Sequence, residues 1–70
     1  MTPHTHWVPT RIELPPENIV VDTKIDDEAG PRNETPLIRK GRVWFHPDMS
    51  MYVYYTPTHW KHDDRPAYPL

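Results

Sequence analysis

The stretch Asn18–Ile25 has the sequence NIVVDTKI, and it is the part of the chain that predicts the fold class. Every second residue from its second position onward is apolar or β-branched: Ile19, Val21, Thr23 and Ile25. In an extended chain such residues share one face, and a period of two is typical of a half-buried β-strand. We therefore predict a strand over 18–25, with an antiparallel sheet built around it.

Proline is the most unusual feature of the composition, with ten prolines among 70 residues. Each proline fixes its own φ angle and lacks a backbone N–H, so prolines scattered along a chain leave no room for a long helix. The longest stretch without proline, 17–30, contains the predicted strand and then becomes acidic. The sequence therefore predicts an all-β chain: a small antiparallel sheet of three to four short strands with extended, proline-rich ends.

The segments after the first strand predict the other elements. Asp26–Thr35 contains four acidic residues, a glycine and a proline, which together indicate a solvated loop. Residues 37–40 and 42–46 flank Gly41, either as a tight hairpin or as one strand with a glycine bulge. Residues 51–56 alternate again and predict a further strand.

The chain is short enough to form one domain only, residues 1–70, whose ends 1–6 and 64–70 we expect to be frayed. It has no cysteine, so no disulfide can stabilise its small core. We expect the two terminal tryptophan segments to lie against one face of the sheet. The predicted core consists of large apolar side chains: Trp7, Leu14, Ile19, Val21, Val43, Phe45, Val53 and Trp60.

Composition also argues against several classes of partner. The formal net charge is −2 with neutral histidine, which makes nucleic acid an unfavourable partner. The N-terminal residues lack the pattern of a signal peptide, and no stretch approaches the roughly 18 apolar residues of a membrane span. The absence of cysteine removes the usual mark of an oxidising compartment. We expect a cytoplasmic protein that does not contact the membrane.

Short motifs along most of the chain follow the order found in a known family. They are Trp7-Val8-Pro9-Thr10, Glu13-Leu14-Pro15, Gly41 followed by Trp44, Tyr52-Val53 and Thr58-His59-Trp60. Over residues 7–66 the chain resembles the domain of unknown function 551 family, whose members are small phage and prophage proteins. The resemblance implies a phage or prophage origin, hence a host-cell cytoplasm, and a small β fold. It transfers no catalytic residue.

The chain departs from this family in two places. Its closing tryptophan is followed by Lys61-His62-Asp63-Asp64-Arg65-Pro66, where the family usually has Met-Pro-Leu-Pro. Its acidic segment before Thr35 is also unusually long. The closing segment is therefore more polar than the resemblance alone implies.

The tripeptide Thr5-His6-Trp7 recurs near the other end of the chain as Thr58-His59-Trp60. We interpret the repeat as structural, with two antiparallel end segments pairing their tryptophan rings over the core and placing each histidine at the margin of the sheet. The alternative is a zinc site, because imidazoles suit tetrahedral zinc and a metal would stabilise so small a domain. Its ligands would be His4, His6, His59 and His62. We expect no metal and no other cofactor.

Two groups of residues are candidates for a binding surface. Arg39, Lys40 and Arg42, with the ring of Trp44 nearby, could meet a phosphate or a nucleotide, or could simply form a solvated hairpin whose charges prevent aggregation. The second group consists of rings: Trp44, Tyr52, Tyr54 and Tyr55. A core this thin cannot hold all four, and exposed tyrosine and tryptophan are favoured anchors of protein contacts. The alternative is a set of half-buried rings flanking the sheet of a monomer.

Catalysis is not expected. There is no cysteine nucleophile, only one serine, Ser50, and no phosphate-binding glycine loop. The leading hypothesis is a phage or prophage accessory protein that contacts a host or phage protein, or a second copy of itself as a homo-oligomer through residues 51–56. The alternatives are an oligomer that sequesters a small ligand or nucleotide, and a histidine zinc-binding module.

Overall fold

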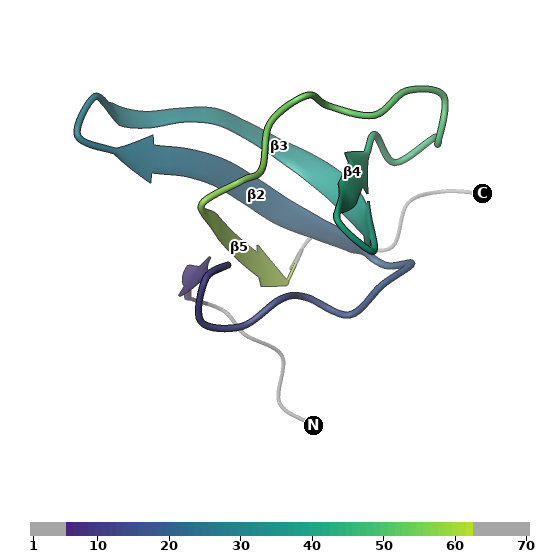
Figure 1. Cartoon of the computed structure of the whole chain (residues 1–70), viewed down its shortest axis with the longest axis horizontal. Helices are drawn as coiled ribbons and strands as arrows, with labels where there is room; N and C mark the ends of the chain where they lie inside the picture. Colours follow the sequence, from purple (N-terminus) through teal and green to yellow (C-terminus); the bar gives the residue numbers. More distant parts are fainter. Residues whose placement is uncertain (1–5, 63–70) are drawn as a thin grey trace.

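The protein is described by a computed structural model in which residues 6–62 are placed, and these form one antiparallel sheet of five strands (Figure 1). In sequence the strands are β1 (Val8–Pro9), β2 (Val20–Asp27), β3 (Gly30–Lys40), β4 (Val43–Phe45) and β5 (His59–His62). In space their order is β1-β5-β2-β3-β4. The all-β prediction is confirmed, with more strands than expected. Over the described residues no helix occurs that could cross a membrane. The expected frayed ends, apart from His6, lie outside these residues.

Strand β2 lies at the centre of the sheet, and its register defines two faces. Val21 pairs with Leu37 of β3, and Thr23 pairs with Trp60 of β5. Directly opposite residues share a face, so these four side chains point the same way, onto what we call the packed face. The intervening residues of β2 point to the other side, which we call the open face. The alternation predicted for residues 18–25 is therefore confirmed at Val21 and Thr23 of β2, both of which are fully buried.

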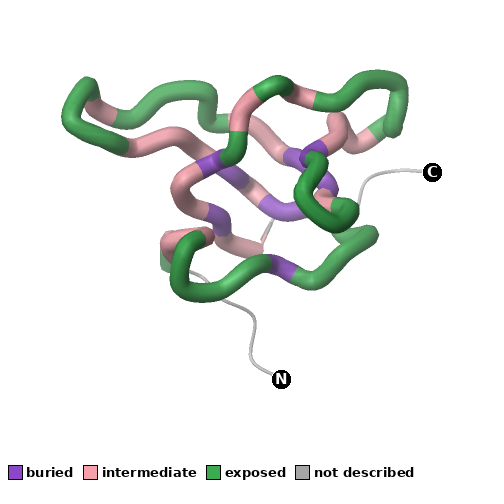
Figure 2. The backbone as a smooth tube through the Cα atoms, viewed as in Figure 1, coloured by how far each residue is buried: buried purple, intermediate pink, exposed green. Residues whose placement is uncertain are grey.

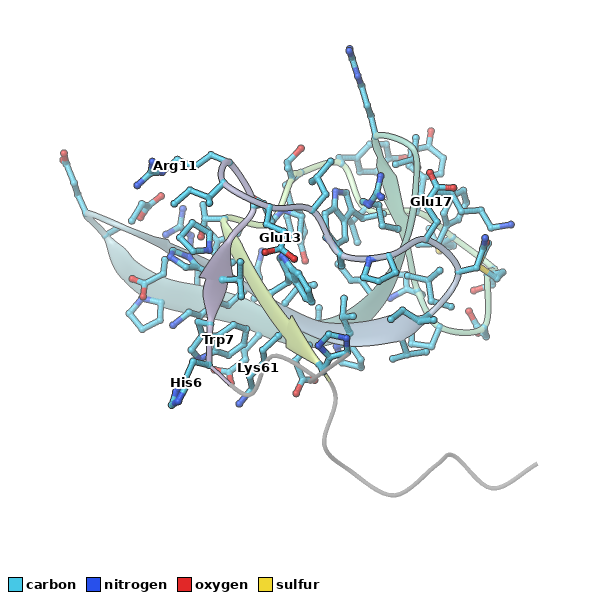
Figure 3. The ribbon with its side chains drawn as sticks, turned by 90° about the horizontal axis from the view of Figure 1, so that it is seen from below. His6, Trp7, Arg11, Glu13, Glu17 and Lys61 are labelled. Atoms are coloured by element: carbon cyan, nitrogen blue, oxygen red, sulfur yellow. The ribbon has the colours of Figure 1, made fainter. Side chains whose placement is uncertain are left out.

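Two irregular segments, 10–19 and 46–58, cover the packed face (Figures 1 and 3). The indole Nε1 of Trp60 donates a hydrogen bond of 2.8 Å to the carbonyl oxygen of Glu13, and this bond ties the first segment to the sheet. The second segment is tied by the backbone N–H of Val53, which donates to the carbonyl oxygen of Trp44 at 2.8 Å. Figure 2 shows that the buried residues collect where these segments meet the sheet.

The core differs from the predicted one in part of its membership. Its buried cluster consists of Val21, Leu37, Trp44 and Trp60, with Val8 and Val53 packed against it. Val21 and Trp60 were predicted, whereas Leu37, Ile38 and Trp44 were missed. Leu14, Ile19 and Val43 are exposed, and so their prediction as core residues was wrong. Leu14 and Ile19 belong to the segment that covers the packed face, and in that segment Pro15 is the residue that is buried.

The acidic stretch 26–35 is not a loop, contrary to the prediction. β2 and β3 continue through it as a hairpin with a turn at 28–29, and this arm projects beyond the rest of the sheet (Figure 1). Two residues of β3, 33 and 34, lie opposite the single residue 24 of β2, which makes a bulge. Asn33 has a φ of +54°, a left-handed conformation that asparagine tolerates. Because the arm extends past the core, its acidic side chains remain solvated on both faces.

Two more predicted elements need correction. Residues 51–56 make no strand and contribute one isolated bridge, Tyr52 to Phe45, because the chain then leaves β4 to cross the packed face. The terminal tryptophan segments do not lie against a face of the sheet, because they are strands within it. Gly41, with a φ of +61°, forms the tight hairpin between β3 and β4 that was one of the two interpretations.

Candidate functional site

The four rings predicted as binding anchors lie in different environments. Trp44 is only 2% exposed and belongs to the core, so its prediction as a surface ring beside the hairpin is wrong. Tyr52 and Tyr54 are 51% and 88% exposed. Tyr55 is partly buried, and burial raises the pKa of its phenol. The expectation that some of these rings lie on the surface is therefore confirmed for Tyr52 and Tyr54.

The exposed tyrosines join a third ring in a row. The ring centroids of Phe45 and Tyr52 are 6.1 Å apart, with an angle of 68° between the ring planes. Those of Tyr52 and Tyr54 are 5.4 Å apart, at 67°. Both pairs have the edge-to-face geometry that aromatic rings prefer. We call Phe45, Tyr52 and Tyr54 the aromatic patch.

The patch lies at the β4 edge of the open face. Ile38 pairs with both Val20 and Phe45, and Val20 precedes Val21 of the packed face. Successive residues of a strand point to opposite faces, so Phe45 belongs to the open face. Tyr52 is directly opposite Phe45 in their bridge and lies on the same side.

A short turn between β4 and Tyr52 sets this geometry. The carboxylate of Asp48 accepts hydrogen bonds from the N–H and the hydroxyl of Ser50, at 3.0 and 2.7 Å. These bonds lower the pKa of Asp48. The N–H of Met49 donates to the carbonyl oxygen of His46, which closes the turn at a left-handed Met49. The chain thereby returns along β4 and brings Tyr52 opposite Phe45.

The predicted cationic hairpin does not place its three charges together. The Nε of Arg39 donates to the carbonyl oxygen of Pro15 at 2.9 Å, and its Nη1 donates to that of Gly41 at 2.8 Å. Arg39 is therefore largely buried and holds segment 10–19 on the sheet. Lys40 and Arg42 remain exposed at the turn. The hairpin therefore presents two solvated cations, Lys40 and Arg42, whereas the guanidinium of Arg39 is hydrogen-bonded within the protein.

The histidines proposed as zinc ligands do not converge. His59 and His62 are three residues apart on β5, and so they point to opposite faces. The His62 ring lies 5.3 Å from the Trp60 ring, and Nδ1 of His59 lies 2.8 Å from the hydroxyl of Thr58. His6 is exposed, and His4 lies outside the described residues. Among residues 6–62 no group of three or more potential ligands could hold a metal ion.

The two end segments pair antiparallel as predicted, but the paired residues are Val8 and Pro9 with Trp60 and His59, so the two tryptophans are not opposite each other. Val8 lies opposite Trp60 in the β1–β5 ladder, so Trp7 points to the other side. Two ammonium groups lie over its ring, with Nζ of Lys24 4.5 Å and Nζ of Lys61 4.9 Å from the ring centroid. Figure 3 shows Trp7 and Lys61 on the side of the sheet opposite Arg11. The expectation that both rings pair over the core was therefore wrong, because Trp7 belongs to the open face.

One open cleft of about 430 Å³ lies beside these strands. It is lined by Pro9, Thr10, Arg11, Asp26, Thr56, Pro57, Thr58 and His59. Several of its polar groups already have partners inside the protein. The hydroxyl of Thr10 donates to the carbonyl oxygen of Pro57 at 2.8 Å, and that of Thr58 accepts from the N–H of Asp26 at 2.7 Å. The cleft therefore has few free groups with which to orient a ligand.

Comparison with known proteins adds no relative to this description. No family model, curated protein or solved structure matches the chain. The resemblance to the domain of unknown function 551 family stays a prediction.

Proposed function

We propose that this chain acts by protein contact and that the aromatic patch is its contact surface. The observation that carries the proposal is Tyr54, a ring that is 88% exposed and yet held edge-to-face against Tyr52. Tyr52 in turn packs on Phe45 of the sheet. An exposed row of rings supported by a strand offers apolar area together with phenolic hydroxyls, which is the usual chemistry of interface anchors.

The tyrosine side chains of the patch are already restrained, which lowers the entropic cost of binding. Tyrosine has few side-chain torsions, so fixing it on binding costs little conformational entropy. Here the neighbouring rings and the Asp48–Ser50 turn already restrain it. A partner that covers Tyr52 and Tyr54 would therefore gain most of the energy of apolar burial.

The phage or prophage setting of the proposal rests on the sequence resemblance. In that setting the partner is a host or phage protein, or a second copy of this chain, and no catalytic step is required. The alternative of a sequestered nucleotide is weakened because Arg39 is engaged with Pro15 and Gly41. The zinc alternative is weakened because His59 and His62 point to opposite faces.

A photo-crosslinking residue in place of Tyr54 tests the proposal in bacterial cells that express the chain. The matched control carries the same residue in place of Ile12, which is 69% exposed and lies in segment 10–19 on the other side of the sheet. We expect one defined product from position 54, either a covalent dimer or an adduct with one other protein, and none from position 12.

The partner identified in this way is then purified and titrated with the chain. Tyr54→Ala should weaken binding by about tenfold or more, as expected for an anchor worth over 1 kcal/mol. Ile12→Ala should leave the dissociation constant unchanged. Equal crosslinking from both positions, or an unchanged dissociation constant for Tyr54→Ala, would contradict the proposal.

A further inference from the structure

We infer that two copies of this chain join through the backbone of Tyr52: their segments 51–53 pair antiparallel about a two-fold axis and continue the sheet from one copy into the other. The inference rests on the proposed function, because it uses the aromatic patch and names a second copy as its occupant. The pairing of the main chains is tested separately from the contact of the rings.

The backbone groups of Tyr52 face away from the protein. On one side of it the N–H of Val53 donates to the carbonyl oxygen of Trp44 at 2.8 Å. On the other side the carbonyl oxygen of Met51 accepts a bond of 2.9 Å from the residue after Phe45. These bonds flank the bridge of Tyr52 to Phe45 and make it a non-hydrogen-bonded pair, in which the N–H and C=O of each residue point away from the other. Those of Tyr52 therefore face outward, and within residues 6–62 they have no hydrogen-bond partner.

Two other outer edges of the sheet are closed to such pairing by proline. β4 pairs only with residues 38–40 of β3, so none of the described strands lies beside residues 31–37 on that side. In this stretch Pro31 and Pro36 lie opposite residues of β2. A proline has no N–H and cannot form a hydrogen-bonded pair, so both occupy positions whose backbone groups face the free edge. Pro9 does the same on β1 at the opposite edge. These prolines remove the donors that an added strand needs.

The segment around Tyr52 has no such protection. Residues 49–60 are the longest stretch of the chain without Asp, Glu, Lys or Arg, and their first proline is Pro57, beyond the bridge. Proteins commonly protect an exposed edge with charged residues or proline, so an edge without either is open to pairing with another chain. Figure 1 shows this segment at the rim of the molecule. The edge at Tyr52 is therefore the one suited to a contact between copies.

Antiparallel pairing of Tyr52 with Tyr52 of a second copy satisfies the free groups. Each N–H donates to the carbonyl oxygen of the other copy, which makes a hydrogen-bonded pair on the two-fold axis. The same surface is then used by both copies, so the assembly closes as a dimer and does not continue into a fibre. The axis is perpendicular to the sheet, and the two open faces therefore lie on the same side of the joined sheet.

The aromatic rings gain from the same arrangement. Directly opposite residues share a face, so the two Tyr52 rings lie beside each other, and cross-strand aromatic pairs stabilise a sheet. Each of them already packs on Phe45, at 6.1 Å, which gives a row of four rings across the junction. Tyr54, which is 88% exposed, flanks that row 5.4 Å from Tyr52. Because only a short stretch pairs, we expect a weak dimer, with a dissociation constant of about 10–100 μM.

A full-length chain with a methyl group on the backbone nitrogen of Tyr52, made by chemical synthesis, tests the main-chain pairing. The methyl group removes the N–H and keeps the ring. Each dimer would lose two hydrogen bonds, so sedimentation equilibrium should give a dissociation constant raised about tenfold or more. The control carries the methyl group on the nitrogen of Leu14, an exposed residue whose N–H likewise has no partner within residues 6–62, and should dimerise like the parent chain. Circular dichroism checks that both chains are folded. An unchanged dissociation constant for the folded Tyr52 variant would overturn the inference.

A mixture of isotope-labelled and unlabelled parent chain gives a second, independent test by NMR. With Tyr52 on the axis, Met51 of one copy lies opposite Val53 of the other in a non-hydrogen-bonded pair, the kind in which the backbones approach most closely. We expect a nuclear Overhauser effect between the Hα atoms of these two residues in different copies. A dimer without this contact, or a monomer at every concentration, would overturn the inference. A crosslink from position 54 to a different protein, with no dimer, would leave the proposed function intact and remove only this inference.

Discussion

Trp60 is the single residue on which the described core depends most. It is fully buried, packs with Val21 and Leu37, and donates its indole N–H to the carbonyl oxygen of Glu13. Trp60→Ala would remove this packing together with the indole hydrogen bond, at a cost of about 3–5 kcal/mol. That is most of the stability available to a 70-residue domain. We expect the variant to show no cooperative thermal transition by circular dichroism, whereas Trp60→Phe retains a weakened one. A native melting temperature for Trp60→Ala would contradict this.

Asp27 is a second residue whose interactions can be measured, through the pKa of its carboxyl group. Its carboxylate receives two hydrogen bonds from Arg32, at 2.7 and 3.0 Å, and these contribute most to lowering its pKa from 3.8 to about 2. A lowered pKa means that the pair stabilises the arm above pH 3.8 and that this contribution is lost as the pH falls towards 2. Arg32→Gln should raise the pKa of Asp27 towards its ordinary value in a carboxyl NMR titration. The pKa of Asp48, which Ser50 lowers, should not move.

Residue by residue, the sequence was informative where burial and alternation coincide. Val21 and Trp60 could be predicted because each is a large apolar residue in an extended segment. Leu37 and Ile38 were missed because the stretch before them was taken for a loop, although they are consecutive apolar residues buried from opposite faces. Of the candidate site, Tyr52 and Tyr54 could be predicted from the excess of rings. The role of Arg39 could not, because its partner Pro15 is distant in sequence.

Among the elements, the β3–β4 hairpin depends on one glycine. Gly41 has a φ of +61°, and a Cβ atom there would meet nothing within 4 Å, so any cost of substitution comes from the backbone alone. Gly41→Ala should reduce the free energy of unfolding by about 1–2 kcal/mol. Gly41→Asn should cost less, because asparagine tolerates the left-handed region. Urea denaturation measures both, and equal stabilities for the two variants would contradict the argument.

The elements that sequence patterns failed to define share a physical cause. The arm of β2 and β3 has solvent on both faces, so its residues carry no apolar alternation, and its pairing is maintained by the backbone ladder and the Asp27–Arg32 pair. Residues 51–56 do alternate, but after the bridge of Tyr52 to Phe45 the chain leaves β4 and reaches the buried Pro57. Alternation predicts an extended segment correctly, and the neighbouring strand decides whether that segment joins the sheet.

For the whole molecule, the homo-oligomer stays a prediction. The aromatic patch is the surface through which we expect two copies to meet. Sedimentation velocity should show a sedimentation coefficient that rises with concentration up to about 100 μM. Tyr52→Ser/Tyr54→Ser should remove the rise. A monomer at every concentration would exclude a second copy as the partner and leave a different protein.

The pairing of β1 with β5 brings the two ends of the described chain together, since Val8 lies opposite Trp60. A circular permutant is therefore feasible, with residues 63–70 and 1–5 as the linker and new termini at the turn 28–29. Such a chain keeps every strand neighbour but changes the β2–β3 hairpin, whose turn is residues 28–29, into the pairing of its two most distant strands. Similar stability with a slower folding rate is the expected consequence, because closing a longer loop costs more entropy before any contact forms.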